Sequence, residues 1–138
     1  MNKQRIACIL SSPKWQRLAN TCAVAIFLSI VVLGSLPGAR EGVGKLASGA
    51  VLHSVAYAIL GLLTFIGGNG SETKRALWAV LKVAVMGAVD EGVQSFLPYR
   101  SAAVGDWLVD VTAGAMISIT LWKYSPKLVG QNSVNRGV

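Results

Sequence analysis

The residues of this chain that can take part in acid–base chemistry are few, and they gather in a small number of short segments. The only histidine, His53, stands four positions before Tyr57, and Asp90 stands four positions before Gln94. Positions four apart lie on the same face of an α-helix. Each pair is therefore expected to present its polar groups in one direction.

A third helical face carries Asp106 and Asp110 and continues through Gly114 and Ser118. Small residues at such positions allow a neighbouring helix to approach closely, so we expect this face to point into the protein. Asp106 also has a simpler interpretation, as the N-cap of the helix that follows it. Asp110 lies one turn further along, where capping does not account for it.

A histidine near several carboxylates supplies general acid and general base groups. The residues predicted to do this chemistry in a catalytic site are His53, Asp90, Glu91 and Asp110. Because Asp90 and Glu91 point about 100° apart on a helix, one of them is expected to face the site, and the sequence favours neither. The residues predicted to bind a substrate in the same site are Tyr57, Gln94, Arg100 and Asp106.

Arg100 has three interpretations, and each follows from its place just after Pro98. It can anchor the chain among lipid headgroups, keep the neighbouring carboxylates ionised, or hold a phosphate or carboxylate with two parallel hydrogen bonds. The two cysteines, Cys8 and Cys22, form no C-x-x-C motif and no Cys/His spacing typical of a metal site. The sequence therefore predicts no bound metal and no cofactor.

The elements that position these residues are expected to be long apolar helices. Hydrophobic residues make up 53% of the 138-residue chain and charged residues only 14%, against roughly 25% charged in an average soluble domain. This composition excludes an isolated soluble domain and a disordered chain. Four stretches approach the about 20 apolar residues that cross a bilayer, at about 18–36, 46–66, 76–97 and 106–122. The third is weaker, because it contains Lys82, Asp90 and Glu91.

The distribution of positive charge predicts the orientation of these helices. Nine lysines and arginines lie in the N-terminal tail, the 67–75 loop and the C-terminal tail, and three lie in the other loops. Positive residues concentrate on the cytoplasmic side, so both termini are predicted to be cytoplasmic. The net charge of +7 then indicates the inner membrane face rather than a nucleic acid partner. All four tryptophans lie at the ends of the stretches, where their N–H groups can stay hydrated: Trp15, Trp78, Trp107 and Trp122.

The predicted fold is thus an all-α integral membrane protein, a bundle of four transmembrane helices. Residues 1–17 are expected to form a basic cytoplasmic tail, residues 18–124 the membrane domain, and residues 125–138 a second cytoplasmic tail. In this orientation His53, Asp90 and Asp110 all lie about 6 to 10 Å below the outer boundary of the membrane. Ionisable residues inside a membrane are energetically costly, so we expect them to share one site facing outward.

The order of these polar residues resembles a known family. The run 90–100, DEGVQSFLPYR, is followed by further polar and small residues as in the signature of the VanZ-like family: Asp106, Asp110 and Gly114. The run 53–61, HSVAYAILG, is similar to the second-helix motif of that family. Two departures stand out: Ser48 and Gly49 replace an Asp-Lys pair that often precedes the histidine, and Ser118 replaces the usual closing glycine.

The resemblance implies a small multi-pass protein of the bacterial plasma membrane. The founding member of the family is associated with reduced susceptibility to the glycopeptide teicoplanin, and many relatives have no assigned role. One hypothesis is a protein that binds or processes a lipid-linked cell-envelope molecule at the outer leaflet. A second is a non-catalytic scaffold or accessory protein, whose polar residues are structural and which binds a second copy or another membrane protein. A third is a proton-coupled carrier, for which four helices are a small framework.

Overall fold

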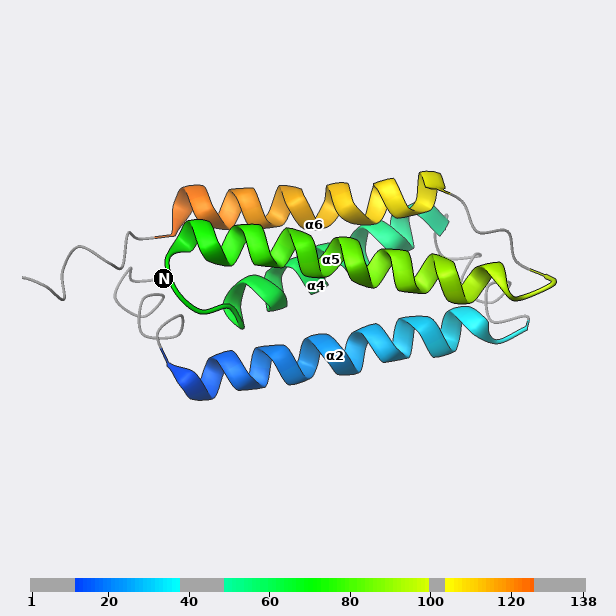
Figure 1. Cartoon of the computed structure of the whole chain (residues 1–138), viewed down its shortest axis with the longest axis horizontal. Helices are drawn as coiled ribbons and strands as arrows, with labels where there is room; N and C mark the ends of the chain where they lie inside the picture. Colours follow the sequence, from blue (N-terminus) through cyan, green and yellow to red (C-terminus); the bar gives the residue numbers. More distant parts are fainter. Residues whose placement is uncertain (1–11, 38–48, 100–103, 126–138) are drawn as a thin grey trace, which may run out of the picture.

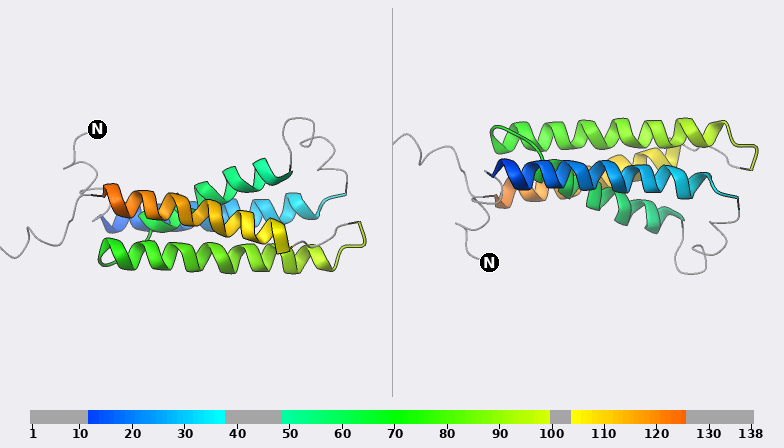
Figure 2. Two further views of the ribbon diagram at one scale, coloured as in Figure 1. Left: turned by 90° about the horizontal axis from the view of Figure 1, so that it is seen from above. Right: turned by 90° about the horizontal axis from the view of Figure 1, so that it is seen from below.

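The computed structural model describes residues 12–37, 49–99 and 104–125. Within these ranges the chain forms four α-helices and no strand, so the all-α prediction is confirmed. The helices are α2 (Pro13–Ser35), α4 (Gly49–Ile66), α5 (Glu72–Ser95) and α6 (Val104–Tyr124). They lie side by side along one long axis, with α4 inclined to the others (Figure 1, Figure 2).

Three of these helices, α2, α4 and α6, are long and apolar enough to cross a membrane. Large apolar side chains are exposed on the outside of each of them, for example Val32 on α2, Val55 on α4 and Ile119 on α6. Contact between such surfaces and water is unfavourable, whereas lipid accommodates them because the helical backbone satisfies its own hydrogen bonds. The chain therefore has the surface of a membrane protein.

Helix α5 has 24 residues and is long enough to cross a membrane, but it is not among the sufficiently apolar helices. The cause is its charged residues, which include Lys82, Asp90 and Glu91. Both carboxylates are buried, while Val85 and Val89 are exposed on the outer side. These two carboxylates of α5 thus face the other helices, and the outer face of the helix at this level is apolar.

The first helix begins earlier than the apolar stretch expected at residue 18. Ser12 is the N-cap of α2, and Pro13 is its first residue. Proline is favoured at that position because its missing N–H has no partner there in any helix. Part of the predicted basic tail, including Lys14 and Arg17, therefore belongs to the first turns of α2.

The glycine-rich turn joins α4 to α5 and is held by side chains from both sides. Gly70 has a positive φ of 90°, which glycine adopts readily. The guanidinium of Arg75 donates hydrogen bonds to the carbonyl oxygens of Gly70, at 3.2 Å, and Ile66, at 3.4 Å. The Asn20 amide on α2 donates to the carbonyl of Gly67 at 2.9 Å. These bonds fix one end of the bundle.

In the middle of the bundle three helices meet closely, because α4 and α6 each have a glycine there. A Cβ atom on Gly61 of α4 would lie 2.9 Å from the Cα of Gly114 on α6. A Cβ on Gly114 would lie 2.6 Å from a methyl group of Val83 on α5. Ser118, one turn further along α6, is fully buried. As the sequence predicts, the small residues on this face of α6 allow close helix approach.

Candidate functional site

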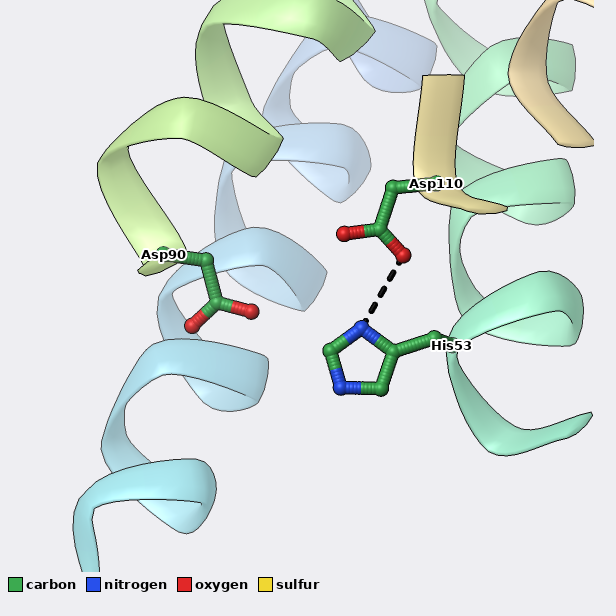
Figure 3. A group of neighbouring side chains, drawn as sticks. All are labelled: His53, Asp90 and Asp110. Carbon is green, nitrogen blue, oxygen red and sulfur yellow. Dashed lines mark hydrogen bonds and ion pairs between the residues drawn. The ribbon is translucent and has the colours of Figure 1, made fainter. Parts of the chain in front are cut away.

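The site begins with a contact between the N-terminal parts of α4 and α6. Nδ1 of His53 lies 2.9 Å from Oδ1 of Asp110, a distance that fits donation from the ring N–H to the carboxylate (Figure 3). The His53 side chain is 16% exposed, whereas that of Asp110 is fully buried. Two residues that are 57 positions apart in the sequence are therefore partners.

Helix α5 contributes the third polar group. Asp90 is buried and extends its carboxylate toward the His53 ring and Asp110 (Figure 3). One donor atom from each of His53, Asp90 and Asp110 lies within 4.8 Å of the other two. The Tyr57 hydroxyl donates to Oδ2 of Asp90 at 3.3 Å, and its ring stacks on His53 with centroids 6.0 Å apart. We call His53, Tyr57, Asp90 and Asp110 the polar cluster.

The polar cluster lies near one end of the bundle. Its three ionisable residues are each a few residues from a helix end. His53 is four residues from the start of α4, Asp90 five from the end of α5, and Asp110 six from the start of α6. The helices alternate in direction, so these positions come to similar heights. The three residues therefore lie at a similar height in the bundle, whereas their depth in a membrane stays a prediction.

The structure distinguishes Asp90 from Glu91, which the sequence does not. Asp90 lies in the polar cluster and is 1% exposed. Glu91 is also buried, at 8% exposed, but its carboxylate is not part of the group of three donor atoms. Gln94 is buried one turn beyond Asp90. The face of α5 that carries Asp90 and Gln94 therefore points into the bundle, and Glu91 borders it.

Two oxygen atoms of the polar cluster have no hydrogen-bond partner among the described residues. They are Oδ1 of Asp90 and Oδ2 of Asp110, and both are buried. In the same part of the chain, neither carboxylate forms an ion pair with a lysine or arginine. An unsatisfied buried polar atom costs about 1 to 3 kcal/mol, and more if it is charged. The site thus has two carboxylate oxygens that could accept hydrogen bonds or bind a ligand but contact no donor among the described residues.

The remaining predicted site residues have different positions. Arg100 lies outside the described residues, so its three interpretations stay predictions. Asp106 is half-buried and is the third residue of α6, so the interpretation as its N-cap is wrong. The helix begins two residues earlier, at Val104, and a carboxylate in the first turn is stabilised by the helix dipole.

The predicted hydration of the indole N–H groups is wrong for two tryptophans. That of Trp122 donates to the Thr73 hydroxyl at 3.1 Å. The indole N–H of Trp107 donates to the carbonyl of Ala84 on α5 at 3.0 Å, so it is bonded within the protein rather than hydrated. Next to it is Gly87, which sequence reasoning missed. A Cβ on Gly87 would lie 3.4 Å from Oδ2 of Asp110 and 3.1 Å from the Trp107 ring. Its position three residues before Asp90, on the same helix face, was the available signal.

A shallow groove of about 380 Å³ runs along the outside of α6 and is bordered by one residue of α4. Its lining is mainly apolar and comprises Ser54, Leu108, Val109, Thr112, Ala113 and Met116. Ser54 and Val109 are the sequence neighbours of His53 and Asp110. The groove therefore lies at the same level of the bundle as the cluster.

No protein-family model matches this chain, and no match was found among the curated proteins or among the solved structures. The chemistry of the polar cluster and the apolar surface around it are therefore the basis for assigning a function.

Proposed function

We propose that this chain is a four-span, VanZ-like protein of the bacterial plasma membrane that binds or processes a lipid-linked cell-envelope molecule. In this proposal both termini are cytoplasmic, and the polar cluster faces the outer leaflet. The headgroup of the ligand reaches the cluster, and its hydrocarbon chain remains in the surrounding lipid. Reduced glycopeptide susceptibility is one expected consequence.

The observation that carries the proposal is the hydrogen bond between His53 and Asp110, with Asp90 beside it, in an otherwise apolar bundle. A histidine oriented by one carboxylate is able to accept and donate a proton, as in general acid–base catalysis. Ionisable residues within membrane segments are most often retained for such functions. The cluster draws its residues from three helices, two from α4 and one each from α5 and α6, and ligand sites in helix bundles are built from side chains on facing helices.

The groove along α6 supports a lipid ligand rather than a soluble one. Its lining is mainly apolar, and its exposed residues Leu108 and Met116 lie on the outer face of α6. A hydrocarbon chain in this groove leaves its polar end at the level of His53. A soluble, polar substrate would gain little binding energy from such an apolar surface.

A topology measurement tests the orientation in this proposal. Reporter fusions after residues 40, 70 and 102 and at the C-terminus are expected to read outside, inside, outside and inside, because the positive charges are concentrated on one side. A cytoplasmic reading at residue 102 would contradict the placement of the cluster near the outer leaflet.

A structural role is the second candidate, and one observation favours it. The hydrogen bonds of the polar cluster link α4 to α6 through His53 and α4 to α5 through Tyr57. Interhelical hydrogen bonds in membranes contribute about 0.6 kcal/mol on average. In this alternative the protein is a scaffold or accessory protein, and loss of the cluster lowers its stability rather than its ligand binding.

Native mass spectrometry of the full chain extracted in mild detergent tests lipid binding. The wild type is expected to carry a lipid with an acidic headgroup, and His53→Gln is expected to lose most of it, since glutamine keeps a polar group but cannot exchange a proton. Thr64→Val is the matched control on the same helix. The Thr64 hydroxyl is buried but bonds only to carbonyls of its own helix, at 2.7 and 3.1 Å.

The two candidate functions give different results in this experiment. Equal lipid retention by the wild type and His53→Gln would contradict a ligand site at the polar cluster. A lower thermal midpoint of His53→Gln, with lipid retention unchanged, would support the structural role instead.

A further inference from the structure

The donor atoms of the polar cluster are of the types that bind first-row divalent cations. Imidazole nitrogen and carboxylate oxygen are both ligands of Zn²⁺, and carboxylates also suit Mn²⁺. His53, Asp90 and Asp110 offer one nitrogen and two carboxylates from three different helices. The sequence showed no metal motif, because these ligands come from separate segments with no short spacing.

The distances within the cluster are close to those of a coordination sphere. Bonds of about 2.1 Å at right angles place adjacent donor atoms about 3.0 Å apart and opposite ones about 4.2 Å apart. The contact between His53 and Asp110 is 2.9 Å. The three donor atoms lie within 4.8 Å of one another, so a shift of about half an ångström brings the widest pair into range.

The two unbonded oxygens are independent evidence for a ligand. Oδ1 of Asp90 and Oδ2 of Asp110 are buried and have no hydrogen-bond partner in the described part of the chain. Asp90 is 1% exposed, Asp110 is 0% exposed, and both carboxylates point into the space between α4, α5 and α6 (Figure 3). Such atoms are costly unless something binds them. A cation that Asp90 binds through Oδ1 and Asp110 binds through both of its oxygens satisfies them.

The charges of the site agree with a divalent ion. Two ionised aspartates beside a neutral histidine carry a charge of about −2, which burial makes unfavourable without a counter-charge. A divalent cation brings this charge to zero. Tyr57 holds Oδ2 of Asp90 at 3.3 Å, which leaves Oδ1 free to face the ion.

We propose that His53, Asp90 and Asp110 bind one divalent first-row metal ion of the Mn²⁺ or Zn²⁺ type. Three protein ligands leave at least one coordination position open, as in catalytic metal sites. The occupant of that position is a phosphate oxygen of the lipid headgroup, and this part of the proposal rests on the proposed function. Ion binding at Nδ1 replaces the hydrogen bond between His53 and Asp110. The ring stays neutral, because the proton released from Nδ1 to solvent is balanced by one taken up at Nε2.

The test uses full-length protein in detergent, treated with a chelator and exchanged into metal-free buffer. Titration with Mn²⁺, followed by the loss of the free-ion electron paramagnetic resonance signal, is expected to show one ion per chain. Asp90→Asn is expected to weaken Mn²⁺ binding at least about tenfold, because it removes one anionic ligand. Zn²⁺ added to the Mn²⁺ complex is expected to displace the bound ion.

Glu72→Gln is the matched control, because it removes one carboxylate from the opposite end of α5. It is expected to bind Mn²⁺ as the wild type does. Circular dichroism of both variants verifies that they are folded, and His53→Gln supplies a second ligand variant if Asp90→Asn is unfolded. Wild-type protein that binds neither Mn²⁺ nor Zn²⁺ stoichiometrically would overturn the proposal, as would folded ligand variants with unchanged affinity.

The metal proposal and the proposed function fail in different measurements. Metal binding is measured without added lipid, and lipid retention is measured by mass spectrometry on the protein as purified, before any chelator is added. If His53→Gln loses lipid but the wild type binds no metal, only the metal site is overturned. Stoichiometric Mn²⁺ binding without any copurifying lipid overturns only the assignment of a lipid ligand.

Discussion

Exchanging Asp110 for asparagine should remove most of the copurifying lipid while the bundle remains folded. The asparagine side chain has nearly the same volume as that of aspartate, but it no longer offers His53 a charged acceptor at 2.9 Å. The charge-assisted hydrogen bond that orients the His53 ring is worth about 1.5 to 3 kcal/mol. Because we propose that the headgroup binds the oriented ring, we expect lipid affinity to fall by up to roughly 150-fold. Native mass spectrometry measures the loss as the fraction of protein that retains lipid.

Ser118→Ala is the control on the same helix. Ser118 is buried two turns below Asp110, and its hydroxyl donates only to the carbonyl of Gly114, at 2.8 Å. Its replacement is expected to leave lipid retention unchanged. If Asp110→Asn unfolds the protein, the carboxylate is structural. If the variant folds and retains lipid as the wild type does, the carboxylate is not part of a ligand site.

Replacing Gly114 with valine is expected to give the largest loss of stability. Even the first added carbon would lie 2.6 Å from a methyl group of Val83, which is fully buried and has no space into which to move. Overpacking of a tight core costs about 1 to 3 kcal/mol and occasionally more. At the upper end of this range the thermal midpoint falls by roughly 6 to 12 °C, measured by circular dichroism in detergent.

Gly105→Val separates the effect of packing from the change in helix propensity, which by itself favours valine over glycine. Gly105 lies on the same helix, and a Cβ atom there meets nothing within 4 Å. Its replacement is expected to change the midpoint by no more than a few degrees. Similar midpoints for the two variants would mean that the bundle tolerates a wider spacing of α4, α5 and α6 than the structure has.

The sequence predicted the helices well because their signals are local. The apolar stretches, the glycine turn after Ile66 and the polar spacing of His53 with Tyr57 are all read from neighbouring residues. The start of α2 at Pro13 was missed because the apolar stretch begins only at about residue 18. The signal for the start is the serine followed by proline at residues 12 and 13. Similarly, the start of α6 depends on backbone hydrogen bonds before Asp106, which the apolar pattern does not report.

Half of the predicted site residues form the polar cluster, namely His53, Tyr57, Asp90 and Asp110, and their detailed arrangement could not be predicted. The sequence predicts that His53, Asp90 and Asp110 lie at one level, because position along a helix follows from counting residues at a fixed rise. The choice between Asp90 and Glu91 depends on how α5 is rotated about its axis, and that rotation is set by contacts such as Gly87 against Asp110. Such contacts between distant segments leave no pattern in a single sequence.

The close approach of Gly61 to Gly114 also has a mechanical consequence. His53 lies eight residues from this crossing, about 12 Å along α4, so a rotation of α4 by about 2.5° there moves His53 by about half an ångström. Figure 2 shows α4 already inclined to its neighbours on this side of the crossing. The tilt of a transmembrane helix responds to the thickness of the bilayer. A change in bilayer thickness that tilts α4 about its contact with α6 is therefore expected to change the distance between His53 and Asp90.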